Sequence, residues 1–205
     1  DRLVARGLLD GPGALTAAGR EFKQRIEDTT DEVALSALNG LDDAEVERLR
    51  DAFAQFPSGV VAVAATIDGK PVGMAISAFA PVSLDPPLGG IFVANTSSTW
   101  QVLRTAPTLG VSILGGEHDR LAKRLAGPAE HRFDEVPFST GDRGAVVIDG
   151  TPLALEVTVE SESPAGDHTL VLLRIRSVEV RPEHSTLLFH RSILSGLATI
   201  DAADR

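Results

Sequence analysis

The chain of 205 residues contains no cysteine, and this absence excludes several kinds of chemistry. Without thiols there is no disulfide, no thiolate nucleophile and no cysteine-ligated metal site. The absence also fits a cytoplasmic protein, which is the location we expect. Tyrosine is missing too, and methionine and tryptophan occur once each. No apolar run approaches the roughly 18 residues of a membrane-spanning helix, so we expect no contact with a membrane.

Net positive charge is also lacking, because 29 acidic residues outnumber 19 lysines and arginines and give a formal charge of −10. Non-specific nucleic-acid binding depends on Lys and Arg, so we expect no nucleic-acid partner for this chain. A nucleotide cofactor is still compatible with the charge, because backbone amides and hydroxyls can hold a phosphate. The sequence begins at Asp1 without an initiator Met or an apolar signal segment, so we take it as part of a longer chain.

Motifs for metal binding and for nucleophilic catalysis are missing as well. No histidine lies three or four residues from another, so we predict no metal site. The five are His118, His131, His168, His184 and His190. The glycine patterns of phosphate-binding loops and the Gly-x-Ser-x-Gly elbow of hydrolases do not occur either.

The first 53 residues have helical periodicity and form the first predicted domain. Thr16 is expected to cap a helix in which Phe22 and Ile26 share a face. Asp42 and Glu45 have the spacing of a capping box. Apolar residues then follow at helical spacing, at Val46, Leu49 and Phe53.

Residues 54–200 form the second predicted domain, which is rich in short strands. The apolar run GVVAVAATI ends in Asp-Gly, a strong hairpin signal. Residues 153–162 alternate apolar and polar side chains, and we expect them to pair with a strand at 168–180 across a loop at 163–167. Two short helices are expected, near residues 98–105 and 117–127. Many short antiparallel strands with few helices indicate a closed or nearly closed barrel.

The stretch VANTSSTWQVL contains the strongest candidate for a ligand site. A strand is expected to end at Asn95, hydroxyl residues 96–99 follow, and a helix begins with Ser98 as N-cap and Gln101 closing a capping box. Exposed amides and the helix dipole attract an anion there, which makes a phosphate seat. The alternative is an ordinary helix cap that needs no ligand.

A second candidate is GMAISAFAPVSLDPPL, in which small side chains would let a flat ring approach the backbone. The prolines after Asp85 are expected to stiffen the chain into an extended turn. The alternative is a strand that ends at a sheet edge, where prolines prevent further pairing.

Taken in order, several stretches resemble the flavin reductase family, whose fold is an FMN-binding split barrel. They are FPSGVVAVAA, DGKPVGMAISAFAPVSLDPPL, SSTW, HRF, GDHTLVL and LLFHR, within about residues 54–195. The resemblance implies a mainly β fold with helices: an antiparallel split barrel preceded by a helical N-terminal segment. It also implies hydride transfer from NADH or NADPH to FMN or FAD, and delivery of reduced flavin to a partner monooxygenase.

The resemblance further implies which residues form the site. Those expected along the isoalloxazine ring are Met74, Ala75, Ile76 and Ser77, with Ser83 near its polar edge. Those expected around the ribityl phosphate are Asn95, Thr96, Ser97, Ser98 and Thr99, followed by Trp100. His168 is the predicted catalytic residue, placed beside the nicotinamide to steady its orientation. Family members often have hydroxyl residues where this chain has Ala75 and Ala78, which favours flavin as an exchanging substrate.

Oligomeric state and the role of the N-terminal segment complete the expectations. Residues 1–53 resemble part of a MarR-like winged-helix region, with a short wing at residues 11–13; alternatively, they form an arm that packs on the barrel or on a second subunit. We expect a homodimer with each flavin near the subunit boundary, because a shallow cleft leaves one side of a planar ring uncovered. A non-catalytic flavin sensor and a barrel that uses a deazaflavin remain as alternatives.

Overall fold

The computed structural model describes residues 4, 8, 10, 14–21 and 41–197 of the chain. The chain divides into two compact units, residues 1–50 and 51–205. The predicted wing at residues 11–13 and the apolar pair Phe22 and Ile26 lie outside the described residues. Among the described helices, none is long and apolar enough to cross a membrane.

Both predicted helix caps of the N-terminal segment are confirmed. Thr16 Oγ1 accepts a hydrogen bond from the Gly19 amide at 3.0 Å, before the helical residues 17–21. Glu45 N donates to Asp42 Oδ1 at 2.8 Å, and Asp42 N donates to Glu45 Oε2 at 3.1 Å, which is a reciprocal capping box. Helix α3 (Asp43–Phe53) follows this box and contains no buried residue.

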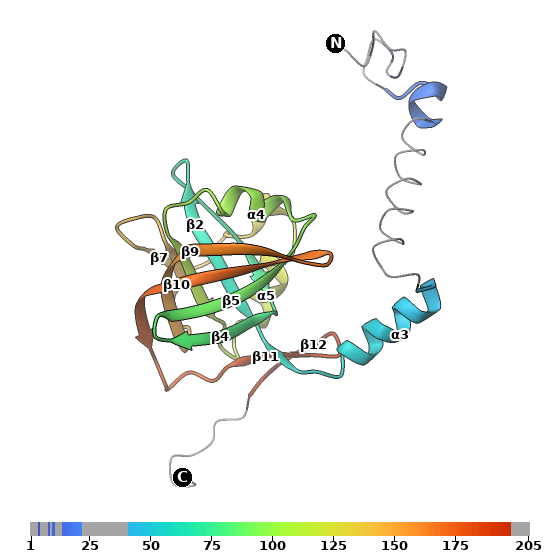
Figure 1. The fold of residues 1–205 in the computed structure, drawn as a ribbon. Helices are drawn as coiled ribbons and strands as arrows, with labels where there is room; N and C mark the ends of the chain where they lie inside the picture. The colour runs from blue at the N-terminus through green and yellow to red at the C-terminus, as the bar shows by residue number, and fades with distance from the viewer. Residues whose placement is uncertain (1–3, 5–7, 9, 11–13, 22–40, 198–205) are drawn as a thin grey trace. The chain divides into compact units, whose positions relative to one another are not determined.

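The second unit is an antiparallel barrel built on a seven-stranded sheet of order β3-β2-β6-β9-β10-β5-β4 (Figure 1). Its strands are β2 (Val61–Ile67), β3 (Lys70–Ile76), β4 (Phe79–Leu84), β5 (Pro87–Ala94), β6 (Leu109–Ile113), β9 (Leu153–Ala165) and β10 (His168–Val180). Two small sheets pair β1 (Ser58–Gly59) with β11 (Leu187–His190) and β12 (Ile193–Gly196), and β7 (Phe138–Thr140) with β8 (Val146–Ile148). The helices are α4 (Ser98–Leu103), α5 (Asp119–Leu125) and the 3-10 helix η1 (Ala129–His131). The predicted fold class is confirmed.

Two apolar clusters explain the patterns in the sequence. One fills the barrel and includes Val61, Val63, Ile91, Val93, Leu109, Val111, Leu155, Val157, Val171 and Leu173. The other lies beside α5 and includes Val60, Ala62, Leu114, Ala122, Leu125, Ile148 and Leu187. Strand β2 contributes to both clusters, and this burial on two faces is why its sequence is a continuous apolar run.

Tight turns set the register of the hairpins. Asp68 and Gly69 join β2 to β3 with φ values of 49° and 76°, as the sequence predicts for a type I′ turn. The predicted loop at 163–167 is wrong, because β9 continues to Ala165 and only Gly166 and Asp167 form the turn. Gly166 has φ 68°, which a residue without Cβ adopts at little cost. The long β9–β10 hairpin in Figure 1 therefore keeps its pairing up to this two-residue turn.

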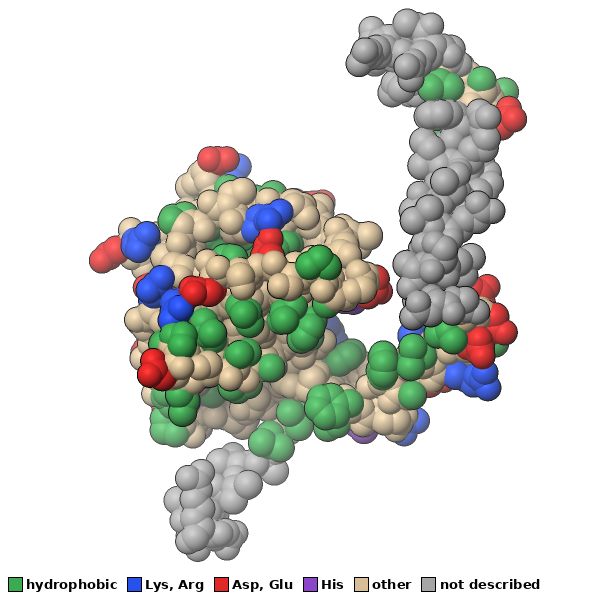
Figure 2. All heavy atoms as spheres, in the orientation of Figure 1, with side chains coloured by type: hydrophobic (Ala, Val, Ile, Leu, Met, Phe, Trp, Pro, Cys, Tyr) green, Lys and Arg blue, Asp and Glu red, His purple; other side chains and the backbone are tan. Residues whose placement is uncertain are grey.

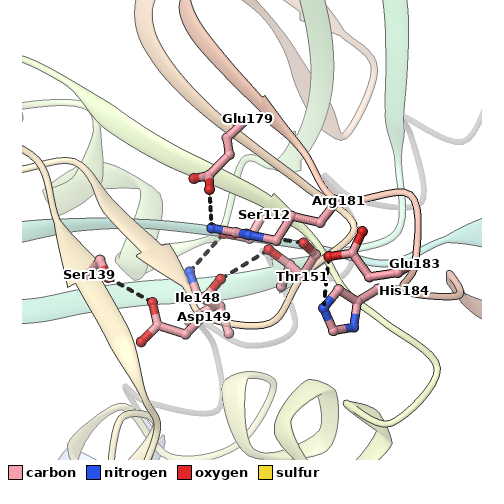
Figure 3. Close-up of polar contacts among 9 residues, drawn as sticks. All are labelled: Ser112, Ser139, Ile148, Asp149, Thr151, Glu179, Arg181, Glu183 and His184. Atoms are coloured by element: carbon pink, nitrogen blue, oxygen red, sulfur yellow. Dashed lines mark hydrogen bonds and ion pairs between the residues drawn. The ribbon is translucent and has the colours of Figure 1, made fainter.

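Buried hydroxyls fasten strand β8 to the barrel (Figure 3). Ser112 Oγ accepts a hydrogen bond from the Ile148 amide at 2.9 Å, and Thr151 Oγ1 donates to the Ile148 carbonyl at 3.0 Å. Ser112 and Thr151 are both fully buried, so these bonds satisfy polar groups that water does not reach. Arg181 Nη1 donates to the Thr151 carbonyl at 3.2 Å and is paired with Glu179 at 2.6 Å, which ties the far end of β10 to the same cluster.

Stability at mildly acidic pH is expected to depend on His118, at the start of α5. Its Nδ1 accepts a hydrogen bond from the Gly115 amide at 2.9 Å, and burial lowers its pKa against the opposing effect of Glu117, while His184 lowers it further. Below a pH of about 6.5 the unfolded chain therefore binds more protons than the folded one, and the free energy of unfolding falls. Denaturant titrations should show that acidification lowers the free energy of unfolding less in His118→Asn than in the unaltered protein. The Asn amide oxygen can accept the same bond without titrating. Equal losses in both proteins would contradict this.

Candidate functional site

The ends of β5 and β10 bring two of the predicted ligand stretches together. His168, the first residue of β10, is paired with Ala94, the last residue of β5. Asn95 follows directly, and its amide donates to the Asp167 carbonyl at 2.9 Å. The Asn95 side chain is also bonded to Gly166, which is 71 residues away in sequence. Two distant segments of the chain therefore meet at one edge of the barrel.

The imidazole of His168 is held by its neighbour in sequence. His168 Nδ1 lies 2.7 Å from Asp167 Oδ1, and this hydrogen bond lowers the pKa of the Asp167 carboxyl below its usual value. An ionised carboxylate can only accept, so the proton of the pair is on Nδ1. The His168 side chain is 43% exposed. With the proton on Nδ1, the other ring nitrogen, Nε2, is the one that faces away from Asp167 and is left for a ligand.

The N-terminus of α4 differs by one residue from the prediction. Ser97, not Ser98, is the N-cap, and its Oγ accepts from the Trp100 amide at 3.2 Å. The predicted capping box of Ser98 and Gln101 is therefore wrong, because the neighbouring Ser97 and Ser98 are equally good caps and local sequence does not choose between them. Thr96 and Ser98 are exposed beside this cap.

Trp100 is part of the barrel core rather than of an open site. It is 3% exposed, and its Nε1 donates to Glu162 Oε1 at 3.0 Å. Glu162 also pairs with Arg104, so this carboxylate fastens α4 to strand β9. The Trp100 side chain therefore has little surface left for a flavin, and its contact with flavin stays a prediction.

Arg132 is a candidate site residue for which the sequence predicts no role. Its Nη1 donates to Thr99 Oγ1 at 2.8 Å and to the Gly73 carbonyl at 2.9 Å, and its Nε donates to the Gly127 carbonyl at 2.8 Å. Among the ion pairs of the described residues, none includes this half-buried guanidinium. A positive charge without an acidic partner next to the hydroxyl-rich loop is suited to an anionic ligand. The only signal in the sequence is the HRF stretch.

A cavity of about 280 Å³ lies at the end of strand β3. It is lined by Val60, Ala75, Ile76, Ser77, Ala122, Lys123, Ala126, Phe189, Ser192 and Leu194. Most of these side chains are apolar, and Lys123 and the two serines supply polar groups at the wall. Ligand sites of about 300–1,000 Å³ with such walls are common, so the cavity fits a ring system with one polar edge.

The loop 95–99 and the cavity both lie beside strand β3. Ser97 Oγ lies 3.8 Å from Met74 Sδ, and Arg132 links Thr99 to Gly73. The last residues of β3, Ala75 and Ile76, and the following Ser77 border the cavity. From Gly73 to Ser77 an extended strand covers roughly 13 Å, so an anion site and a ring site can be occupied by one extended ligand.

The predicted ring contacts Met74, Ile76 and Ser83 stay predictions, and the structure places them as follows. Ile76 is 7% exposed and, like Met74, packs with the barrel core, although Ile76 also lines the cavity together with Ala75 and Ser77. Ser83 is paired with Leu88 near the β4–β5 turn. Asn95 lies at the other end of β5, roughly 20 Å away along an extended strand, so the structure does not bring Ser83 to the loop 95–99.

Comparison with known proteins assigns this chain to a family. Residues 53–198 match the family model named flavin reductase like domain. The chain belongs to the flavin reductase family. This confirms the resemblance that the sequence motifs predict.

Relatives of this flavin reductase include enzymes of known name. It is 34% identical to "Flavin reductase" of Pseudomonas putida over 74% of this chain and 89% of the relative. It is 28% identical to the reductase subunit HsaB of a flavin-dependent monooxygenase of Rhodococcus jostii, over 73% of this chain and 77% of the relative. Among solved structures, the NADH:FAD oxidoreductase SgcE6 of Streptomyces globisporus C-1027, in complex with NAD and FAD fragments, superimposes with a TM-score of 0.72 and 31% identity, over 79% of this chain and 98% of that chain.

The N-terminal part of this flavin reductase has a separate match. Residues 1–67 match the model of a helix-turn-helix family. This match agrees with the predicted likeness of the first 53 residues to part of a winged-helix region.

Proposed function

We propose that this flavin reductase transfers hydride from NADH or NADPH to FMN or FAD and supplies the reduced flavin to a partner monooxygenase. The observation that carries the proposal is that the loop 95–99 contacts both the turn of His168 and strand β3, which borders the cavity. The similarity to a monooxygenase reductase subunit supports the partner. A flavin-sensing protein has no need for a nicotinamide contact.

Each part of the edge has its own task in this proposal. Ser98, Thr99 and Arg132 bind the phosphate, and the cavity beside Ala75 and Ser77 holds the isoalloxazine ring. His168 Nε2 accepts a hydrogen bond from the nicotinamide carboxamide and thereby orients the ring that carries the hydride. Flavin and pyridine nucleotide supply the redox chemistry, so no side chain is required as a nucleophile.

Flavin is proposed to be an exchanging substrate rather than a permanent cofactor. The cavity wall has a methyl group at Ala75, and Ala78 is exposed just beyond β3, so neither position offers a hydroxyl to the ring. Reduced flavin that is held weakly can leave for a second enzyme.

The proposed reaction is tested by following NADH absorbance with and without added FMN or FAD. NADH should be consumed only when flavin is present, and NADPH in parallel shows the preferred nucleotide. A protein that binds FMN and leaves NADH unchanged would instead be the non-catalytic flavin-binding protein.

Arg132 is expected to discriminate phosphorylated flavins from riboflavin. Arg132→Gln should weaken FMN binding by about 1–3 kcal/mol, since a charge-assisted bond to the phosphate is lost. Riboflavin, which has no phosphate, should bind almost equally well to both proteins. Arg124→Gln is the matched control, because Arg124 also donates to a backbone carbonyl, that of Asp134. Equal losses for FMN and riboflavin would show that Arg132 only supports the fold.

We further propose that the protein is a homodimer that pairs through the outer side of β4, β5 and β10. Val82, Leu170 and Leu172 surround Gly90 there, and Phe92 is 41% exposed beside them. Figure 2 shows apolar side chains gathered over these strands. Monomers rarely expose a continuous apolar patch, and a closed two-fold pair is the commonest oligomer.

Light scattering should give a particle of twice 21.6 kDa for the unaltered chain. Phe92→Lys should reduce it to a single chain, because a charge would be buried in the centre of the pairing face. Val180→Lys is the matched control, since Val180 is 63% exposed at the far end of β10. A dimer that survives Phe92→Lys would refute this interface.

A further inference from the structure

The side chain of Asn95 is committed to the turn that carries His168. Asn95 Nδ2 donates to the Gly166 carbonyl at 3.1 Å, and Asn95 Oδ1 accepts from Thr169 Oγ1 at 2.8 Å. The Asn95 backbone amide donates to the Asp167 carbonyl at 2.9 Å. An amide side chain can donate two hydrogen bonds and accept two, so half of its bonding capacity, including one site on each of its polar atoms, is already used within the chain.

We propose that Asn95, together with Thr169, is a positioning residue that fixes His168 for the nicotinamide, and that Asn95 is not a ligand of the flavin. The inference rests on the role proposed above for His168. It assigns to Asn95 a different task from the phosphate contact that the sequence motif predicts.

We call the Asn95 side-chain bonds to Gly166 and Thr169 the clamp. The position of the turn shows why it is needed. Strand β10 begins at His168, and its partner β5 ends opposite it at Ala94. Beyond that pair, the only backbone bond from the β5 side to the turn, among the described residues, is the one from the Asn95 amide to the Asp167 carbonyl. The Asn95 side chain extends the support of β5 by holding both sides of the turn, through Gly166 and Thr169.

Loss of the Asn95 bonds to the turn is expected to impair the reaction rather than to destabilise the fold. The turn is exposed, so breaking the clamp creates no cavity in the core. The His168 imidazole is carried by this turn and bonded to Asp167 within it, so any displacement of the turn moves the imidazole as well. A misplacement of about 1 Å at a reacting group can cost on the order of a hundredfold in rate.

Three variants test the clamp. Asn95→Ala removes both side-chain bonds, Asn95→Asp removes the donor to Gly166, and Thr169→Val removes the hydroxyl with little change of shape. Thr158→Val is the matched control, because Thr158 on the neighbouring strand β9 also loses one bond, from Arg176 Nε at 3.1 Å. FMN affinity is measured by titration of flavin fluorescence, and the KM for NADH by steady-state kinetics.

Asn95→Ala is expected to raise the KM for NADH by about tenfold. FMN affinity should stay within about twofold. In a His168→Ala background the same change should add less than about twofold, because residues that act through one group are not additive. A weaker FMN affinity with an unchanged KM would overturn the proposal and make Asn95 a flavin ligand. Additive losses in the double variant would overturn it as well.

An NMR measurement separates this proposal from the role of His168 itself. The imidazole resonances of His168 should shift or broaden in Asn95→Ala and in Thr169→Val, and remain unchanged in Thr158→Val. If His168→Ala leaves the kinetics unaltered, the nicotinamide role fails, while altered imidazole resonances still support the clamp. Unchanged resonances in both clamp variants would overturn the clamp.

Discussion

Replacing His168 with Ala is expected to raise the apparent KM for NAD(P)H and to lower turnover by roughly ten- to a thousandfold. The imidazole is exposed at the tip of the β9–β10 hairpin, and its bond to Asp167 leaves Nε2 for the carboxamide. Losing this contact leaves the nicotinamide bound in many orientations, few of which bring its hydride to the flavin. Steady-state kinetics with NADH and with NADPH measure the effect.

Two further variants make the His168 prediction specific. His168→Gln places an amide oxygen near the position of Nε2 and should restore part of the activity. His131→Ala is the matched control, because His131 forms a similar exposed pair with Asp134 at 2.9 Å, and it should change neither parameter. Stability should be nearly the same in all three proteins. Kinetics of His168→Ala equal to those of the unaltered enzyme would remove His168 from the mechanism.

Gly110→Ala is expected to destabilise the barrel by about 3 kcal/mol or more. Gly110 lies in β6, paired with Ala64 of β2 and Glu156 of β9. A Cβ at this position would lie 1.9 Å from the Val146 carbonyl oxygen, which belongs to the backbone of β8. A backbone atom cannot rotate away as a side chain can, so the strand itself must move.

Strand β8 cannot shift without breaking other contacts, which is why the expected loss is large. The bond between Ser112 and the Ile148 amide holds β8 to the strand that contains Gly110. Chemical denaturation measures the free energy of unfolding. Gly59→Ala is the matched control, because a Cβ there meets nothing within 4 Å. A Gly110→Ala protein as stable as the control would mean that β8 is not fixed to this strand.

Features that depend on neighbouring residues could be predicted from the sequence. The Asp68–Gly69 turn, the box of Asp42 and Glu45 and the alternation in β9 are set by backbone conformation, capping and burial over a few positions. The length of the β9–β10 turn was mispredicted because Ser163 and Pro164 resemble a loop, although they continue an exposed strand.

The site depends on contacts that no local pattern contains. Arg132 reaches Gly73 across 59 residues and Thr99 across 33, and Asn95 reaches Thr169 across 74. Motif resemblance named the stretches, but it could not tell which side chains face a ligand and which are used to hold the chain. The fold decides this, and it moves Trp100 into the core and Arg132 beside the loop 95–99.

The burial of Trp100 on α4 also gives the protein an internal optical reporter. The chain has one tryptophan and no tyrosine, so its near-ultraviolet emission comes almost entirely from this indole. Trp100 follows Thr99 directly, and its bond to Glu162 holds the indole in one orientation. Oxidised flavins absorb light where tryptophan emits, so a flavin at the loop 95–99 should quench this emission by resonance energy transfer. Reduced flavins absorb less in that range, so the same signal can follow arrival, reduction and departure of the flavin without any added label.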